Sequence, residues 1–193
     1  LGSRSVFCGV YGNPQLHWYA SQGAIDKAAS QFTRLLADAE TQEKLNLAIH
    51  PIGPFQRFTV GPYDVLSVKA NHAAPLMTML FVINQGDRTL FYGTDTSEMG
   101  EETWQALEEY GRSFNVVVFD HTFGFKGRSG GHMNAEQFLE QVTRLRQAKL
   151  LADDARIYAT HLGHHSHPVH KELNAYARQH GYEVAYDGLV ITV

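Results

Sequence analysis

The feature that most constrains the fold of this chain is a short apolar run, Asn115–Asp120, which reads Asn-Val-Val-Val-Phe-Asp. A continuous apolar run is typical of a strand that is covered on both faces, whereas a half-exposed strand alternates apolar and polar residues. Such a strand needs packed layers on either side of its sheet. The run therefore predicts a strand buried between layers, and the order of the expected elements, hairpins followed by strand–helix–strand–helix–hairpin, predicts a layered α/β domain with mixed sheets and with helices outside them.

The segments before and after this run supply the other strands. Two pairs of alternating segments predict hairpins, 55–60 with 63–70 across Gly61-Pro62 and 78–84 with 88–93 across Gln85-Gly86-Asp87. Further strands are expected at 16–20, as a short buried strand after the Gly12-Asn13-Pro14 turn signal, and at 156–161. A last hairpin is expected at 182–186 and 189–193, because Asp187-Gly188 is a strong type I′ turn signal.

The expected helices are marked by caps and by apolar residues at helical spacing. They cover 22–39 after Ser21, 98–110 after Thr96 or Ser97, 135–150 after Asn134, and a last helix that opens at Pro168 and ends at Gly181. In the third of these, Phe138, Val142 and Leu145 form the buried stripe. The sequence shows no repeats and no low-complexity linker, so residues 1–193 are expected to form a single domain.

Composition narrows the function classes. The net charge of −4 weighs against a DNA-binding module, although a local basic groove for RNA stays open. Cys8 is the only cysteine, so no intrachain disulfide can form and a reducing, cytoplasmic compartment is expected. The chain contains no apolar run long enough to cross a membrane.

A histidine-rich stretch follows the strand expected at 156–161. Five of the 11 histidines lie between His161 and His170. Neutral imidazole is the commonest metal ligand in proteins, so the stretch suggests a metal site, and the alternative is a polar surface loop.

Polar residues also stand at the ends of several expected strands. His72, Asp95, Asp120-His121 and His161 each end a strand, and strand ends converge at one edge of a layered α/β fold. Imidazoles with a carboxylate suit Zn²⁺, Mn²⁺ or Fe²⁺, and a carboxylate can bridge two such ions. Taken singly, each residue could be an ordinary polar group, and Asp95 could belong to a helix cap.

The order of several short motifs resembles the metallo-β-lactamase superfamily. They are Asn71-His72, Gly93-Thr94-Asp95-Thr96, Phe119-Asp120-His121, Gly131-His132-Met133-Asn134, Thr160-His161-Leu162-Gly163-His164 and Tyr186-Asp187-Gly188. Within that superfamily the chain is most similar to the phosphodiesterase branch that includes the phosphoribosyl 1,2-cyclic phosphate phosphodiesterase of phosphonate breakdown. The resemblance implies an αββα sandwich and covers essentially the whole chain, aligned with the last two-thirds of such an enzyme.

The resemblance implies a role for each site residue. His72 corresponds to a ligand of a first metal, Asp95 to the carboxylate that bridges two metals, and His161 to a ligand of the second. His132 corresponds to a general acid or phosphate contact, and His164 to a residue that faces the substrate or supports the site. Asp120 and His121 are expected only to support the loop.

One departure from the family limits these expectations. The superfamily's His-x-His-x-Asp-His loop, which supplies further ligands to both metals, does not occur in this sequence. The chain is therefore expected to be a fragment that lacks the N-terminal part of the fold, or else a truncated relative. On its own it is expected to hold metal weakly or partially and to be inactive, and it could dimerise to cover exposed strands.

The implied activity is hydrolysis of a small, anionic phosphodiester, for example a cyclic one, through a hydroxide held between two divalent metal ions, Zn or Mn. The glycine-rich loop with Lys126 and Arg128 could close over the anion, or it could be a surface connection. Three alternatives remain: an RNA 3′-processing nuclease, a lactone or thioester hydrolase, and a non-catalytic binding domain.

Overall fold

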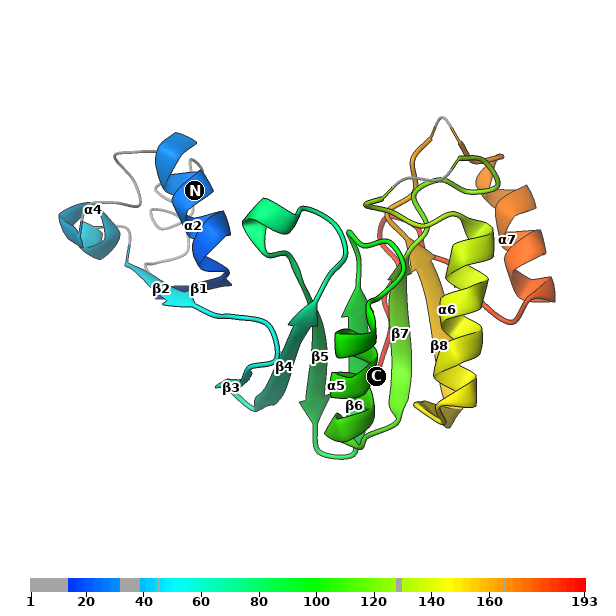
Figure 1. Ribbon diagram of the computed structural model, residues 1–193, viewed down its shortest axis with the longest axis horizontal. Coiled ribbons are helices and arrows are strands. Elements are labelled where there is room, and N and C mark those ends of the chain that lie inside the picture. The colour runs from blue at the N-terminus through cyan, green and yellow to red at the C-terminus, as the bar shows by residue number, and fades with distance from the viewer. Residues whose placement is uncertain (1–13, 32–38, 45, 128–129, 165) are drawn as a thin grey trace. The chain divides into compact units, whose positions relative to one another are not determined.

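The computed structural model describes residues 14–31, 39–44, 46–127, 130–164 and 166–193. The chain divides into two compact units, residues 1–53 with 75–77, and residues 54–74 with 78–193 (Figure 1). Residues 32–38 of the expected helix at 22–39 lie outside the described residues. The expectation of a single domain stays a prediction.

In the first unit, strand β1 (Leu16–Ala20) pairs in parallel with β2 (Leu47–Pro51). Helix α2 (Gln22–Gln31) starts after Ser21, whose Oγ accepts a hydrogen bond from the Ala24 amide at 3.2 Å, so the predicted cap is confirmed. A short helix, α4 (Ala39–Lys44), precedes β2. The strand at 16–20 is present, but only its last residue is buried, so the prediction of a buried strand was wrong.

The described part of the second unit is built on a seven-stranded sheet in the order β3-β4-β5-β6-β7-β8-β9. The strands are β3 (Arg57–Val60), β4 (Tyr63–Lys69), β5 (Met79–Gln85), β6 (Arg88–Gly93), β7 (Phe114–Asp120), β8 (Leu151–Thr160) and β9 (Glu183–Val184). Strands β3 to β6 pair antiparallel, and β6 to β9 pair in parallel. Both predicted N-terminal hairpins are confirmed, with Gly61 and Gly86 at positive φ in their turns.

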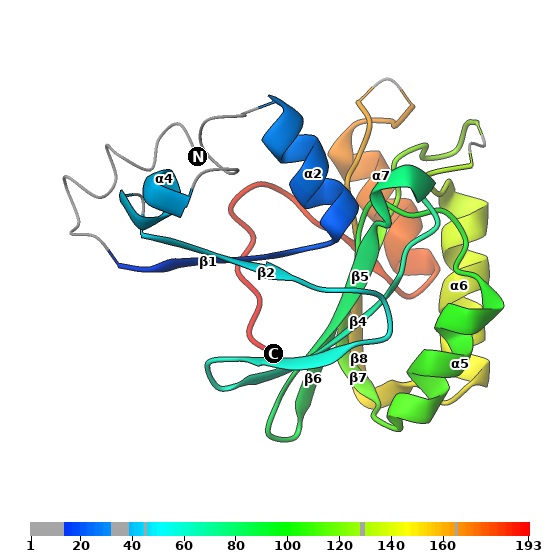
Figure 2. The same cartoon turned by 60° about the vertical axis from the view of Figure 1, so that its left-hand side comes forward.

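Strand β7 forms the centre of the core, as its apolar run predicts. Phe114, Val117 and Phe119 are fully buried. Helices α5 (Glu101–Tyr110) and α6 (Ala135–Gln147) cover one face of the sheet, and the C-terminal segment runs along the other (Figures 1 and 2). The predicted stripe of α6 is confirmed, because Phe138, Val142 and Leu145 are all buried in that core.

Two helix starts differ from prediction. The N-cap of α5 is Gly100, because the hydroxyls of Thr96 and Ser97 bind elsewhere, that of Ser97 to the Asn71 carbonyl at 3.0 Å. Helix α7 (His170–Gln179) has Val169 as its N-cap, so Pro168 lies before the helix.

The predicted C-terminal hairpin is wrong. Strand β9 pairs in parallel with β8, and residues 189–193 form no strand. The Asp187-Gly188 turn itself forms, since the Leu189 amide donates to the Tyr186 carbonyl at 3.0 Å. The predicted turn is therefore confirmed, but β9 pairs with β8, a strand distant in sequence.

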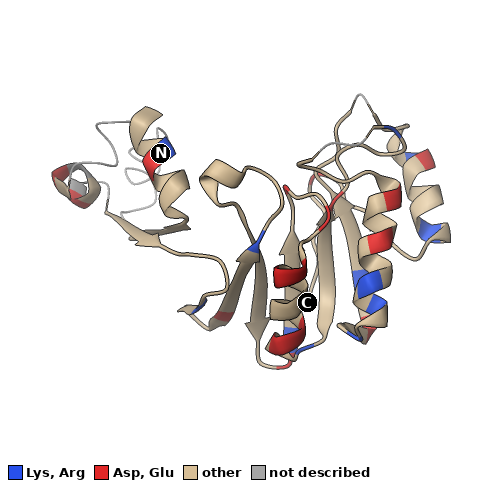
Figure 3. Ribbon diagram, viewed as in Figure 1, with Lys and Arg blue, Asp and Glu red and all other residues tan. Residues whose placement is uncertain are grey.

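Charged residues are divided along the outer helices. Helix α5 is acidic at its start, and α6 runs from acidic Glu136 to basic Arg144 and Arg146 in its last turn (Figure 3). Within the described residues no helix is both long and apolar enough to cross a membrane.

Candidate metal centre

The strand directions explain why distant polar residues meet. Strands β4 and β6 both run antiparallel to β5, and β7 and β8 run parallel to β6. All four strands therefore end at the same edge of the sheet. His72 follows β4, Asp95 follows β6, Asp120 ends β7, and His161 directly follows β8.

Asp95 and His161 occupy the left-handed backbone region, with φ of 54° and 60°. This region is uncommon for residues other than glycine and costs roughly 1–3 kcal/mol, so the surrounding structure holds both residues in place. The turn brings His161 Nε2 to 3.1 Å from Asp95 Oδ1. His72 Nε2 lies 3.9 Å from the same oxygen. Two imidazole nitrogens therefore converge on one carboxylate oxygen.

The opposite nitrogen of each ring is also engaged. His72 Nδ1 lies 2.9 Å from the Gly131 carbonyl, and His161 Nδ1 lies 2.8 Å from Thr122 Oγ1. Because a carbonyl only accepts hydrogen bonds, His72 carries a proton on Nδ1, and Nε2 is the nitrogen that faces Asp95. A cation placed between this nitrogen and the carboxylate oxygen would be bound by both. The donor set and this orientation fit Zn²⁺ or Mn²⁺.

Asp120 is fully buried and organises the loops around the site. Its Oδ1 accepts hydrogen bonds from the Thr122 amide, the Thr122 hydroxyl and the Met133 amide, at 3.0, 2.8 and 3.2 Å. Its Oδ2 accepts from the Thr96 amide at 3.3 Å and lies 2.8 Å from His132 Nδ1. With its lone pairs used in this way, Asp120 suits the supporting role expected of it.

His132 lies within the same cluster. Its ring stacks on that of His161, with centroids 5.1 Å apart and 15° between the planes, and its centroid is 4.6 Å from that of His72. Among the described residues, ligand atoms of Asp95, Asp120, His132 and His161 lie within 4.8 Å of one another. The structure thus brings together His72, Asp95, His132 and His161, and their individual roles stay predictions.

His164 is not part of this group. It is exposed in the loop after β8 and lies outside the cluster of candidate ligand atoms. Its predicted contact with substrate therefore stays untested.

Sequence reasoning missed Thr122, whose hydroxyl touches Asp120, His132 and His161. The one available signal was its position two residues after the strand-end carboxylate, and a threonine there is not distinctive.

His121 is a core residue. It is fully buried beside Phe138, with Nε2 3.2 Å from the Tyr182 hydroxyl. Burial lowers its pKa to about 4, and nearby His167 contributes to the shift. Burial also raises the pKa of Tyr182 above its usual value. His121 is therefore neutral at pH 7, and from the core it supports the loop that follows β7.

Two glycines permit close approach at the site. A Cβ on Gly131 would lie 2.9 Å from His72 Nδ1, and one on Gly163 would lie 2.8 Å from the Thr122 carbonyl oxygen. The loops that carry His132 and His161 can pack this closely only because these positions have no side chain.

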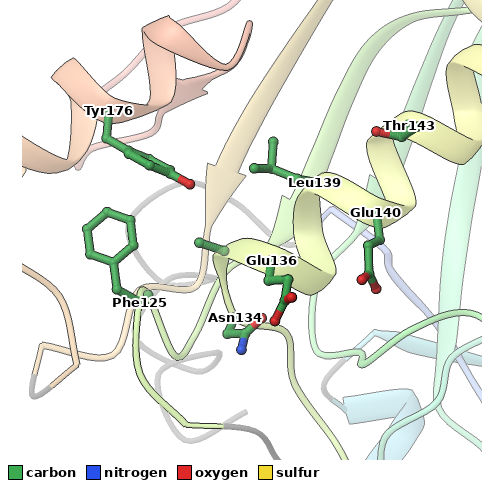
Figure 4. Close-up of a pocket in the computed structure, with 9 residues that line it drawn as sticks. Phe125, Asn134, Glu136, Leu139, Glu140, Thr143 and Tyr176 are labelled. Carbon is green, nitrogen blue, oxygen red and sulfur yellow. The ribbon is translucent and has the colours of Figure 1, made fainter.

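A separate cleft of about 560 Å³ lies between α6, α7 and the loop after β7 (Figure 4). Phe125 and Tyr176 meet edge to face in it, with centroids 4.7 Å apart, and Glu136 and Glu140 project from α6. None of the predicted site residues lines this cleft.

The structure is similar to several solved proteins. These include the metallo-β-lactamase fold protein YhfI from Bacillus subtilis, with 20% identity over 97% of this chain and 68% of that chain and a TM-score of 0.68. A diphosphatase from the PhnP family has 18% identity over 97% of this chain and 62% of that chain, and a TM-score of 0.66. Zn²⁺-bound PqqB from Methylobacterium extorquens has 17% identity over 98% of this chain and 69% of that chain, and a TM-score of 0.65.

The chain thus spans 62–69% of the length of these three proteins. A search of curated proteins finds no significant match. The family description "Beta-lactamase superfamily domain" matches residues 7–162, which is well over half of the sequence. With the fold shared by these structures, this match shows that the chain belongs to the β-lactamase superfamily domain family and has the predicted metallo-β-lactamase fold.

Proposed function

We propose that this chain is part of a metal-dependent hydrolase that cleaves a small, anionic phosphodiester. One observation carries the proposal: the Nε2 atoms of His72 and His161 lie 3.9 and 3.1 Å from one oxygen of Asp95, at the edge where the catalytic loops of the fold converge. A shared carboxylate between two imidazoles is the arrangement from which a two-metal centre is built.

His72, Asp95 and His161 would hold the metal ions, Zn or Mn. When bound, such ions polarise a phosphoryl oxygen and lower the pKa of coordinated water to near neutrality. The chain's own contribution is orientation. Gly131 fixes the His72 ring through the Nδ1 hydrogen bond, and the left-handed turns at Asp95 and His161 aim their side chains at one point.

His132 would serve as the general acid. Asp120 Oδ2 lies 2.8 Å from its Nδ1, which holds a proton on that nitrogen and orients the ring. In the imidazolium form Nε2 also carries a proton, which it would give to the leaving oxygen of the substrate while Nδ1 keeps its bond to Asp120. Because Asp120 is fully buried, its carboxylate is shielded from water and orients the His132 ring without bound substrate.

The choice of a phosphate-containing substrate is supported by the similarity to a diphosphatase of the PhnP family, whose structure aligns with 97% of this chain. Lactone or thioester hydrolysis and RNA 3′ processing are the alternative chemistries for the same fold. A non-catalytic binding role is favoured by one observation, which is that His72, Asp95 and His161 alone make a small ligand set for two metals.

A substrate panel tests the proposal. The longest natural form of the protein that contains this chain would be assayed with saturating Zn²⁺ or Mn²⁺ on a cyclic phosphodiester, a lactone and a precursor tRNA. We expect turnover of the small phosphodiester alone. Turnover confined to the lactone or the RNA would replace the proposed substrate, and inactivity on all three at full metal loading would support the binding role.

Substitution of His132 by alanine tests the acid. Removal of a general acid lowers turnover by about 10²- to 10⁴-fold, and the bound metal measured by mass spectrometry should not change. His180→Ala is the matched control, because that imidazole is exposed at the end of α7 and bonds to the Tyr176 carbonyl, away from the metal centre. Equal loss of metal and activity in His132→Ala would show that His132 is a ligand.

A further inference from the structure

Thr122 occupies the centre of the site without belonging to the proposed ligands or to the acid. Its hydroxyl oxygen lies 2.8 Å from Asp120 Oδ1, 2.8 Å from His161 Nδ1 and 3.2 Å from His132 Nδ1. A hydroxyl has one proton to donate and two lone pairs with which to accept. These three neighbours can therefore be assigned as donors or acceptors.

A carboxylate only accepts hydrogen bonds, so the Thr122 proton is donated to Asp120 Oδ1. His132 Nδ1 lies closer to Asp120 Oδ2, at 2.8 Å, than to the hydroxyl, and its proton is directed to that oxygen. The hydroxyl oxygen is then left to accept from His161 Nδ1. It follows that His161 carries a proton on Nδ1, so Nε2, which lies 3.1 Å from Asp95 Oδ1, is the nitrogen left to bind a metal ion.

The backbone of Thr122 is held as firmly as its side chain. Its amide donates to Asp120 Oδ1 at 3.0 Å. Its carbonyl accepts from the Gly163 amide at 3.1 Å, from Ser166 Oγ at 3.3 Å and from His167 Nε2 at 3.1 Å. The loop that begins at His161 is thereby tied to the residue whose hydroxyl meets the His161 ring.

We propose that Thr122 is a positioning residue that links the buried carboxylate of Asp120 to the imidazole of His161 and so fixes the tautomer in which Nε2 faces the metal. The inference rests on the proposed function for its consequence, which is metal binding. Its structural part, the tautomer, concerns only residues of this chain and can be tested without metal.

The first experiment measures the tautomer directly. In the metal-free chain, Asp95→Gly removes the competing acceptor at Nε2 and suits the positive φ at that position. At a pH where the imidazole is neutral, ¹⁵N NMR should show His161 protonated on Nδ1 in this background. Adding Thr122→Val, which keeps the shape but removes the hydroxyl, should abolish that preference, and Thr122→Ser should retain it. An unchanged tautomer in the valine variant would overturn the proposal.

The second experiment measures Zn²⁺ affinity by calorimetry in the otherwise unaltered chain. Loss of a group that orients a metal ligand lowers affinity by about 10- to 100-fold, so we expect this loss in Thr122→Val and near-normal binding in Thr122→Ser. Ser166→Ala is the matched control, because it removes one bond to the Thr122 carbonyl and leaves the hydroxyl contacts intact. Equal losses in the valine and Ser166 variants would mean that Thr122 acts through loop packing alone, which would also overturn the proposal.

The two experiments separate the inference from the proposed function. If the parent chain binds no Zn²⁺ at millimolar concentration but the tautomer depends on the hydroxyl, the positioning role of Thr122 stands and the metal-dependent function fails. If Zn²⁺ binds and the His161 tautomer does not depend on the Thr122 hydroxyl, the metal-dependent function stands and the positioning role fails.

Discussion

At the scale of single residues, the site illustrates which features a sequence reveals. His72, Asp95 and His161 could be predicted because each is a metal-binding residue type at the end of a strand. Thr122 could not be predicted, because its role depends on three neighbours brought to it by different loops. The same limit applies to Gly131, whose importance lies in the histidine ring packed against it.

Gly131→Ala should weaken metal binding without unfolding the protein. The added Cβ would lie 2.9 Å from His72 Nδ1, so the ring must move and its bond to the Gly131 carbonyl is lost. We expect about a 10- to 100-fold loss in Zn²⁺ affinity, measured by calorimetry. Gly130→Ala is the control, since nothing lies within 4 Å of a Cβ there. Equal behaviour of the two variants would contradict the proposed role of His72.

His121 gives the fold a dependence on pH. Its pKa is about 4 in the folded protein, below the ordinary histidine value of about 6.5, so the unfolded chain binds more protons between these values. The part of the unfolding free energy that depends on a neutral His121 is fully present above pH 6.5 and is lost as pH falls toward 4. The total loss is at most about 3 kcal/mol. In His121→Phe, the unfolding free energy measured by urea denaturation should therefore change less with pH between 4 and 6.5 than it does in the unaltered protein. An unaltered pH profile in the variant would exclude His121 as its source.

At the scale of elements, the predictions that rest on local sequence signals are confirmed, whereas those that depend on pairing between distant segments are not. The N-terminal hairpins formed as predicted because their turn residues and alternation lie within a few residues of each other. The C-terminal hairpin failed because Val184 pairs with Ala159 of β8, a partner that no local pattern indicates. The start of α5 was misplaced because tertiary contacts to Asn71 engage the hydroxyls that would otherwise cap it.

The start of α6 was predicted correctly and has a consequence for the site. Asn134 and Gln137 form a capping box, with bonds of 2.9 and 3.1 Å, just after His132 and Met133. Asn134→Ala should lower the unfolding free energy by about 1–2 kcal/mol in urea denaturation. Asn134→Asp should retain most of the stability, because a carboxylate also accepts from the Gln137 amide and suits the helix N-terminus. Similar losses in both variants would show that the Asn134 bond to the Gly127 carbonyl, at 2.9 Å, matters more than the cap.

At the scale of the whole molecule, the mixed sheet accounts for the position of the site. The antiparallel part places β4 and β6 in the same direction, and the parallel part adds β7 and β8, so four strands deliver their ends to one edge. The fold class could be predicted from the order of the strands and helices, and the apolar run of β7 added that this strand is covered on both faces. The division into two compact units could not, because it depends on contact density rather than on any composition change.

This arrangement leads to a prediction about metal binding by the chain as a whole. Two ions that share His72, Asp95 and His161 have fewer protein ligands than the three or four usual for zinc, so equilibrium dialysis should show weak or partial occupancy. The occupancy that is found should fall in His161→Ala and persist in His164→Ala, because His161 Nε2 is 3.1 Å from Asp95 whereas His164 lies outside the cluster. Two tightly held ions per molecule would mean that other residues complete the coordination. Loss of binding only in His164→Ala would show that the metal binds to the histidine-rich loop at 161–170 and not to the residues at the strand ends.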